Sequence, residues 1–153
     1  MNRPTLVPEL YVTNLGRSLQ FYVDLLGFQI AYQRPETGFA ALSLEGAHLM
    51  LEQTAAVEAA TDEEFAQGQW RTARLEPPFG RGISLEITVA DVQAVSARLL
   101  AHSYPIKLGL QDKWYRVNDR LQGVRQLLVL DPDGYLLRLD QTLGQRAVGA
   151  ETV

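Results

Sequence analysis

One stretch near the C-terminal end decides the fold: Leu127-Leu128-Val129-Leu130-Asp131-Pro132-Asp133-Gly134-Tyr135-Leu136-Leu137-Arg138-Leu139-Asp140. Two apolar runs flank Asp-Pro-Asp-Gly, in which proline presets its own φ and glycine accepts a positive φ. This pattern predicts a β-hairpin closed by a short turn. A weaker copy lies upstream, where Phe39–Leu44 and Leu49–Glu52 flank the turn Glu45-Gly46.

A second pair of matching segments precedes the two hairpins. Val12-Thr13-Asn14-Leu15 and Val89-Ala90-Asp91-Val92 each open a helical pattern, with Asn or Asp as the N-cap. These helix starts lie 77 residues apart, whereas Gly46 and Gly134 lie 88 apart. The chain therefore reads as two βαβββ modules, of which the second carries about eleven extra residues around 109–123.

These boundaries predict an α+β fold in which two tandem βαβββ modules form a curved mixed β-sheet with helices on its outer face. The single domain covers residues 1–153. Module one spans about 6–54, a linker 55–82, module two 83–142 and a C-terminal tail 143–153. The linker contains Thr61-Asp62-Glu63-Glu64, which predicts one capped turn of helix.

Composition narrows the class of function. The 153-residue chain is 46% hydrophobic and 21% charged, with a net charge of −4 and no cysteine. Disulfides and thiolate metal sites are excluded, and the absence of a basic run argues against nucleic acid as a partner. No apolar run reaches membrane-spanning length and no signal-peptide pattern opens the chain, so we expect a cytoplasmic protein with no membrane partner.

Alternation along the predicted strands separates two faces. The apolar face should pack under the helices. The opposite face is mixed and carries Glu9, Tyr11, His48, Met50, Glu52, Ser84, Glu86, Thr88, Arg138 and Asp140. A solvated sheet face is one interpretation. The other is a cleft, formed if the sheet curves, whose four carboxylates against one Arg and one His would suit a cation.

Three motifs carry a resemblance to a known superfamily: Val12-Thr13-Asn14-Leu15 with Ser18-Leu19-Gln20-Phe21-Tyr22, then Leu25-Leu26-Gly27-Phe28, and finally Asp131-Pro132-Asp133-Gly134-Tyr135. Together with the paired modules they are similar to the vicinal oxygen chelate superfamily. That superfamily includes glyoxalase I, extradiol dioxygenases, fosfomycin-resistance enzymes and bleomycin-resistance proteins. The resemblance spans about residues 6–141.

The metal enzymes of this superfamily place His, Gln or Glu ligands on the first and last strand of each module. Counting from the shared motifs, those positions fall on Val7, Met50, Ser84 and Arg138. None offers an imidazole or carboxylate donor, and a guanidinium would repel a cation. We therefore expect no metal, no cofactor and no metal-dependent glyoxalase, dioxygenase or fosfomycin chemistry.

Loss of the metal ligands resembles the bleomycin-resistance branch, which binds the drug without transforming it. The segments Gly38-Phe39-Ala40 and Lys113-Trp114-Tyr115-Arg116 agree with that branch. There, two chains pair, aromatic side chains stack on the flat part of the drug, and acidic surface meets its positive tail. The resemblance implies a homodimer that gives antibiotic resistance by sequestration.

We expect the ligand-binding residues to be Phe39, His48, Met50, Glu52, Trp70, Glu86, Trp114, Tyr115, Arg138 and Asp140. Trp114 and Tyr115 are adjacent, so they point to opposite faces of a strand, and the sequence leaves open which one faces the ligand. Trp70 is a candidate for a ligand or a dimer contact. Arg138 could hold a substrate carboxylate or pair with Glu52, Glu86 or Asp140.

No catalytic residue is predicted, because the chain has no cysteine and only two histidines in unfavourable places. Two alternatives to sequestration remain. One is an enzyme of the same fold, a lyase or isomerase that acts on a small carboxylate or carbonyl substrate. The other is a binding protein for a different small aromatic ligand.

Overall fold

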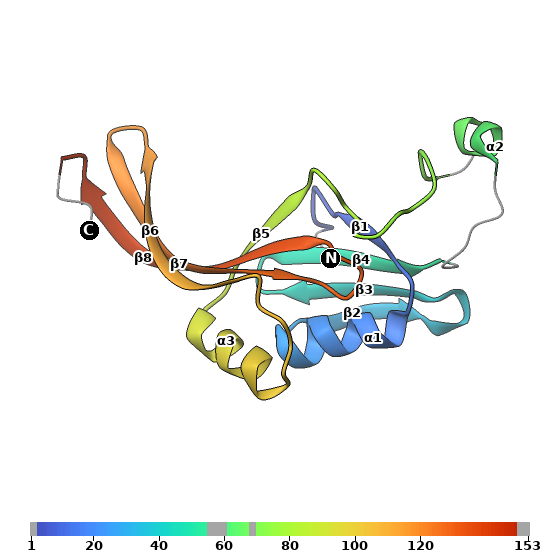
Figure 1. Cartoon of the computed structure of the whole chain (residues 1–153), viewed down its shortest axis with the longest axis horizontal. Helices are drawn as coiled ribbons and strands as arrows, with labels where there is room; N and C mark the ends of the chain where they lie inside the picture. Colours follow the sequence, from blue (N-terminus) through green and yellow to red (C-terminus); the bar gives the residue numbers. More distant parts are fainter. Residues whose placement is uncertain (1–2, 55–60, 68–69, 150–153) are drawn as a thin grey trace.

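Two βαβββ modules of the predicted kind build the molecule (Figure 1). The computed structural model describes residues 3–54, 61–67 and 70–149. Module one contains β1 (Glu9–Val12), α1 (Leu15–Leu19) continued by the π-helical η1 (Gln20–Leu25), β2 (Gln29–Arg34), the 3₁₀ turn η2 (Pro35–Thr37), β3 (Phe39–Leu44) and β4 (Ala47–Gln53). Module two contains β5 (Ser84–Thr88), α3 (Val92–Ala101), β6 (Leu108–Val117), β7 (Arg120–Leu130) and β8 (Leu136–Ala147), and the short helix α2 (Asp62–Ala66) lies between the modules.

Each module forms its own four-stranded mixed sheet. The strand orders are β1-β4-β3-β2 and β5-β8-β7-β6, and in both sheets the first strand runs parallel to the last. This identical topology confirms the predicted repeat and the α+β class. The helix starts are confirmed as well, because the side chains of Asn14 and Asp91 accept hydrogen bonds from the backbone N–H three residues on.

The apolar faces of both sheets meet the helices in one core. Its buried members include Leu10 and Leu51 from module one and Ile87 and Leu139 from module two. Phe21 in η1 stacks against Tyr104, just after α3, with ring centroids 4.8 Å apart. Helices α1 and α3 lie side by side on the same side of the two sheets, and the mixed faces of the sheets are left outside this core (Figure 1).

The Asp-Pro-Asp-Gly turn joins the two modules. The buried Asp131 accepts hydrogen bonds from the Tyr22 hydroxyl at 2.8 Å and from two backbone N–H groups of its own turn. Asp133 accepts from the Thr13 hydroxyl at 2.6 Å. Gly134 has φ 99°, and a Cβ there would lie 2.5 Å from Pro78. The turn thus holds module two against module one, in addition to closing a hairpin.

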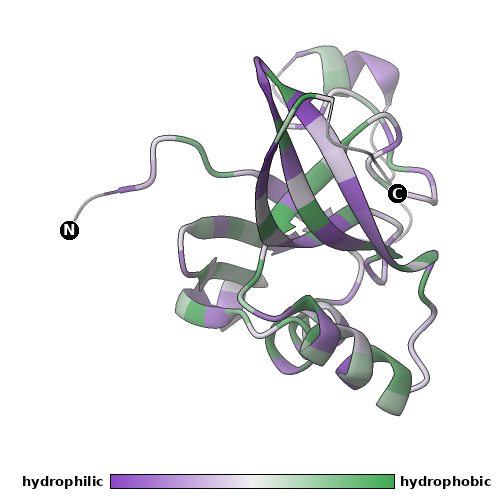
Figure 2. Ribbon diagram, turned by 90° about the vertical axis from the view of Figure 1, so that its left-hand side faces the viewer, coloured by the Kyte–Doolittle hydropathy of each residue, from purple (hydrophilic) through white to green (hydrophobic). Residues whose placement is uncertain are grey.

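The extra residues of module two lengthen its strands. The region around 109–123 forms most of β6, a tight turn in which Asn118 adopts φ 56°, and the start of β7 at Arg120. β8 likewise continues to Ala147, beyond the predicted boundary at 142. The distal parts of β6, β7 and β8 project from the body, with hydrophilic and hydrophobic residues alternating along them (Figure 2).

Within the described residues, no helix combines the length and apolar character needed to span a membrane. The linker and the tail fall partly outside the described residues, at 55–60, 68–69 and 150–153.

Candidate functional site

The mixed face of the module-one sheet is hollowed into a cleft of about 480 Å³. We call it the module-one cleft. It is lined by residues of all four strands and of the segment after α2: Glu9, Tyr11, Tyr32, Arg34, Phe39, Met50, Glu52, Trp70 and Arg71. The strand register explains this grouping, because Tyr11 pairs with Glu52 and Glu52 pairs with Phe39 across the sheet. Residues paired across adjacent strands point to the same face.

Aromatic side chains form one wall of the module-one cleft. The rings of Tyr32 and Phe39 lie 5.8 Å apart between centroids, and the Arg34 guanidinium lies 3.8 Å from the centroid of Phe39. Trp70 is 88% exposed and Tyr32 54% exposed. Such large aromatic surfaces supply stacking area for a flat ligand.

The charges of the cleft are balanced. Two carboxyl groups, Glu9 and Glu52, share a hydrogen bond, which together with burial raises the pKa of Glu9 to about 7. The cleft also contains Arg34 and Arg71. The predicted excess of four carboxylates over one Arg and one His is therefore wrong for this cleft, because the two modules form separate sheets and the linker adds Arg71.

Module two carries a related cluster on the corresponding face. Arg138 binds Glu86, and its guanidinium lies 5.8 Å from the centroid of the Tyr115 ring. Asp140 is 2% exposed and accepts a hydrogen bond from the Thr88 hydroxyl at 2.9 Å. Burial and a hydrogen bond with Glu86 raise the pKa of Asp140 to about 6. We call these residues the module-two cluster.

The structure places the ten predicted residues in two groups and two separate positions. Phe39, Met50, Glu52 and Trp70 line the module-one cleft, and Glu86, Tyr115, Arg138 and Asp140 form the module-two cluster. His48 lies farther along β4, opposite Ser43, and does not line the cleft. Trp114 points away from Tyr115 and packs on Gly123, with the Arg146 guanidinium 3.6 Å from its ring centroid.

Five cleft residues were missing from the predicted set: Glu9, Tyr11, Tyr32, Arg34 and Arg71. Glu9 and Tyr11 could have been predicted from the sequence, since strand alternation already placed them on the mixed face. Tyr32 and Arg34 lie beyond a bulge in β2, which strand alternation does not anticipate. Arg71 reaches the cleft from the linker, where its guanidinium lies 5.1 Å from the Tyr11 ring centroid.

The residues at the superfamily's metal positions do not fit a metal ion. Val7, Met50, Ser84 and Arg138 hold no imidazole or carboxylate group. Across residues 3–54, 61–67 and 70–149, no cluster of three His, Asp or Glu side chains is placed to hold one either.

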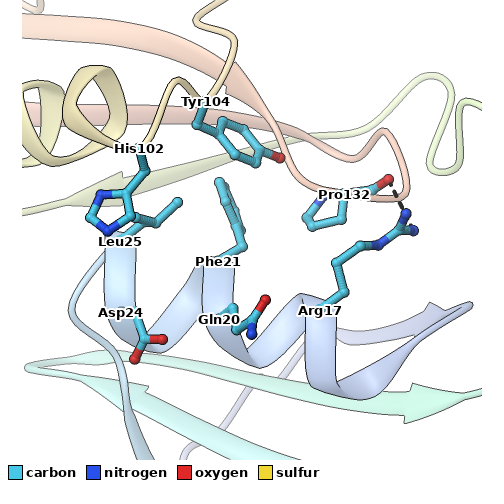
Figure 3. A pocket seen from close by; sticks show the side chains of 8 residues that line it. All are labelled: Arg17, Gln20, Phe21, Asp24, Leu25, His102, Tyr104 and Pro132. Atoms are coloured by element: carbon cyan, nitrogen blue, oxygen red, sulfur yellow. Dashed lines mark hydrogen bonds between the residues drawn. The ribbon is translucent and has the colours of Figure 1, made fainter.

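A second hollow lies on the opposite side of module one, at the seam between η1 and the end of α3 (Figure 3). Several of its polar groups are already bonded: Arg17 donates to the Pro132 carbonyl, and the Tyr104 hydroxyl donates to the Leu130 carbonyl at 2.6 Å. His102 is 2.8 Å from the Arg98 carbonyl oxygen through Nδ1. The first of these bonds joins the modules and the other two lie within module two, so we assign the hollow a structural role.

Comparison with known proteins agrees with this architecture. The family model of the glyoxalase/bleomycin resistance protein/dioxygenase superfamily matches residues 5–139. A member of that superfamily from Vibrio splendidus, whose crystal structure is known, is 31% identical, with a TM-score of 0.39, over 88% of this chain and 95% of its own. The match of the family model over residues 5–139 shows that the protein belongs to the glyoxalase/bleomycin resistance protein/dioxygenase superfamily.

More distant structures share the fold. TioX from Micromonospora is 23% identical, with a TM-score of 0.62, over 90% of this chain and 98% of its own. A virulence protein from Salmonella typhimurium is 19% identical, with a TM-score of 0.59, over 92% of this chain and 97% of its own. No match was found among curated proteins.

Proposed function

We propose that this protein is a metal-free binding protein that sequesters an aromatic, cationic, bleomycin-like antibiotic in the module-one cleft. The observation that carries the proposal is the combination of exposed aromatic rings with a carboxyl pair. Trp70 and Tyr32 offer stacking surface, and Glu9 and Glu52 are the carboxyl groups that an ammonium or guanidinium group of the ligand would contact, in a cleft that also contains Arg34 and Arg71. Sequestration requires affinity without turnover, which is consistent with the absence of a metal-ligand set among the described residues.

We further propose that two chains pair and that the ligand lies between them. The mixed face of each sheet lies outside the core, and the edge strand β2 is exposed throughout. Exposed apolar side chains such as Ile30 on β2 and Val117 on β6 provide surface for a second chain. A partner that covers these faces would also close the module-one cleft, which is open on one side in a single chain.

The experiment is a tryptophan-fluorescence titration with metal-free bleomycin, using protein treated with a chelator. We expect saturable quenching at about one drug per chain with micromolar or tighter affinity, roughly −8 kcal/mol or better. Trp70→Phe should remove most of the quenching, whereas the matched variant Trp114→Phe should retain it. Absence of binding up to high micromolar drug would overturn the sequestration proposal.

One observation favours an enzyme that acts on a small carboxylate as the second candidate. Arg34 and Arg71 both line the cleft and could bind a substrate carboxylate. Arg138, the residue first considered for this role, is bonded to Glu86. Turnover of a small carboxylate or carbonyl substrate that is lost in Arg34→Gln would support the enzyme over sequestration.

A further inference from the structure

The distal parts of β6, β7 and β8 form a three-stranded arm that stands away from the core (Figure 1). We define the arm as residues 109–125 and 141–149. Its strands are paired throughout, for example Tyr115 with Gln122 and Gln122 with Gln145. A small sheet needs an apolar face that is covered from water if it is to be stable. The two faces of the arm therefore differ in importance, according to what covers each of them.

One face of the arm is covered by the arm's own side chains. It continues the core side of the module-two sheet. There the Trp114 ring lies on Gly123, and the Arg146 guanidinium lies 3.6 Å from the centroid of that ring. Beside them Arg125 donates two hydrogen bonds to the Asp112 carboxylate, at 2.8 and 3.0 Å. This face is therefore complete within a single chain.

The opposite face of the arm is open, and it continues the mixed face of module two. The Gln126 amide, which pairs across the sheet with Asp140, donates to the Tyr115 hydroxyl at 2.9 Å. Tyr115 and Val117, two residues apart on β6, share this face and are 42% and 55% exposed. The arm exposes three more large apolar side chains: Leu110, Leu143 and Val148. Apolar surface gathered on one projecting element is typical of a protein contact.

The arm differs in charge from the rest of this acidic chain. It contains five basic residues against two acidic ones, although the whole chain has a net charge of −4. Lys113 and Arg120 lie on the open face, because Arg120 pairs with Val117 and Lys113 alternates with Tyr115 along β6. Module one and α2 have the opposite balance, since residues 3–54 and 61–67 contain eight acidic residues and three arginines. Complementary charge thus favours contact between the arm and the module-one side of a molecule.

A single chain cannot make this contact, because the arm and α2 lie at opposite ends of the molecule (Figure 1). Both rise from the same side of the sheets, away from α1 and α3 (Figure 1). A two-fold axis that passes between them would place the arm of each chain against the α2 end of the other, in two identical contacts. At that end Asp62 and Glu63 are exposed, whereas the Glu64 carboxylate accepts from the Thr61 backbone N–H at 2.7 Å.

We infer that the open face of the arm docks on the α2 end of a second copy of this chain, and that two such contacts hold a symmetric dimer. Val117 and Tyr115 supply the apolar part of the contact, and Lys113 and Arg120 supply its positive charge. The inference rests on the proposed function, which pairs two chains, and it specifies the surface through which they pair. The lengthening of module two at 109–125 thereby acquires a role that module one does not need.

The first test is sedimentation equilibrium of the purified chain without ligand. We expect a dimer for the wild type, and a dissociation constant at least about tenfold higher for Val117→Asp, because a carboxylate would enter the apolar contact. Leu100→Asp is the matched control, since Leu100 is 65% exposed on α3, away from the arm. It should pair like the wild type. Near-ultraviolet circular dichroism of Trp114 verifies that the arm remains folded in Val117→Asp.

The second test exchanges the charges between the two partners. One variant combines Lys113→Glu with Arg120→Glu, and the other combines Asp62→Lys with Glu63→Lys. Each variant alone should dissociate at least about tenfold more readily, because like charges then meet in both contacts. An equimolar mixture should form heterodimers close to wild-type affinity, since each contact again joins opposite charges. Asp24→Lys with Glu45→Lys adds the same charge elsewhere, and this variant should not restore pairing with the arm variant.

A monomeric wild type, or a Val117→Asp variant that pairs like the wild type, would overturn the docking of the arm. Failure of the mixture to recover pairing would also overturn it, because the arm would then cover another surface, such as a second arm. Bleomycin quenching by a monomeric wild type would leave sequestration standing while this inference fails. Recovery of pairing in the mixture, without any bleomycin binding, would overturn sequestration and leave the docking of the arm.

Discussion

Module one and module two share a topology and a strand register. They differ in the side chains on their mixed faces and in the contacts that their hairpin turns make. In module one, the residue opposite Glu9 is the uncharged Met50, whereas the equivalent position in module two holds Arg138, which binds Glu86. The hairpin of module one ends in an exposed turn at Glu45-Gly46, whereas the turn of module two is bonded to module one. A repeat can therefore keep its backbone pairing while its two modules diverge in the side chains of the mixed face and in the contacts of their turns.

The largest expected effect concerns the two turns. Asp131→Ala removes the acceptor of the fully buried Tyr22 hydroxyl and of two backbone N–H groups. Each unsatisfied buried group costs about 1–3 kcal/mol, so we expect the free energy of unfolding to fall by about 3–4 kcal/mol in urea denaturation.

Glu45→Asn is the matched change in the module-one turn. Asparagine tolerates the φ of 51° found at this exposed position, so we expect a change within about 0.5 kcal/mol. A loss below about 1 kcal/mol for Asp131→Ala would contradict the structural role of the module-two turn.

A smaller effect is expected in the lengthened strands that module one lacks. A Cβ at Gly123 would lie 2.6 Å from the Trp114 ring, so Gly123→Ala must displace that ring from its place beside Arg146. Overpacking of this kind typically costs about 1–3 kcal/mol. Near-ultraviolet circular dichroism should report the altered Trp114, and urea denaturation the loss of stability.

Gly109→Ala is the control for this change, because nothing lies within 4 Å of a Cβ at Gly109. We expect that variant to match the wild type in both measurements. If the two alanine variants behave alike, the packing of Trp114 on Gly123 does not stabilise the lengthened strands.

The smallest effect distinguishes the two carboxyl pairs by pH. The hydrogen bond with Glu52 raises the pKa of Glu9 to about 7, so the folded state loses stability as the pH rises from the ordinary value of 4.5 through about 7. Glu9→Gln should therefore gain stability relative to the wild type between pH 5 and pH 8. The gain is at most about 1 kcal/mol, because solvent screens the pair.

Glu86→Gln should show the opposite sign. Hydrogen bonds from Asp140 and Arg138 lower the pKa of Glu86, so its ionised form stabilises the fold above its ordinary pKa and this contribution is lost as the pH falls. We expect Glu86→Gln to be less stable than the wild type at pH 8, with a smaller difference at low pH. Thermal unfolding at both pH values measures the two signs, and identical pH dependence would remove the distinction between the pairs.

Much of the fold follows from the sequence because local patterns and global topology agree. Asn14 and Asp91 mark both helix starts, and alternation separates the core residues Leu10 and Leu139 from the mixed face. Alternation also places Met50 on the mixed face, where it lines the module-one cleft. The resemblance to the superfamily, drawn from short motifs, is confirmed by the match over residues 5–139.

Tertiary structure decided which residues complete the lining of the module-one cleft. Simple alternation places Tyr32 on the same face as Ile30, but the bulge between them turns Tyr32 towards Ala41 and the cleft. Arg71 comes from the linker, which has no periodicity that points to a sheet face. The sequence by itself determined which residues alternate and where the chain turns. Only the folded structure decided which segments distant along the chain meet, because those contacts depend on bulges and docked loops that local patterns do not encode.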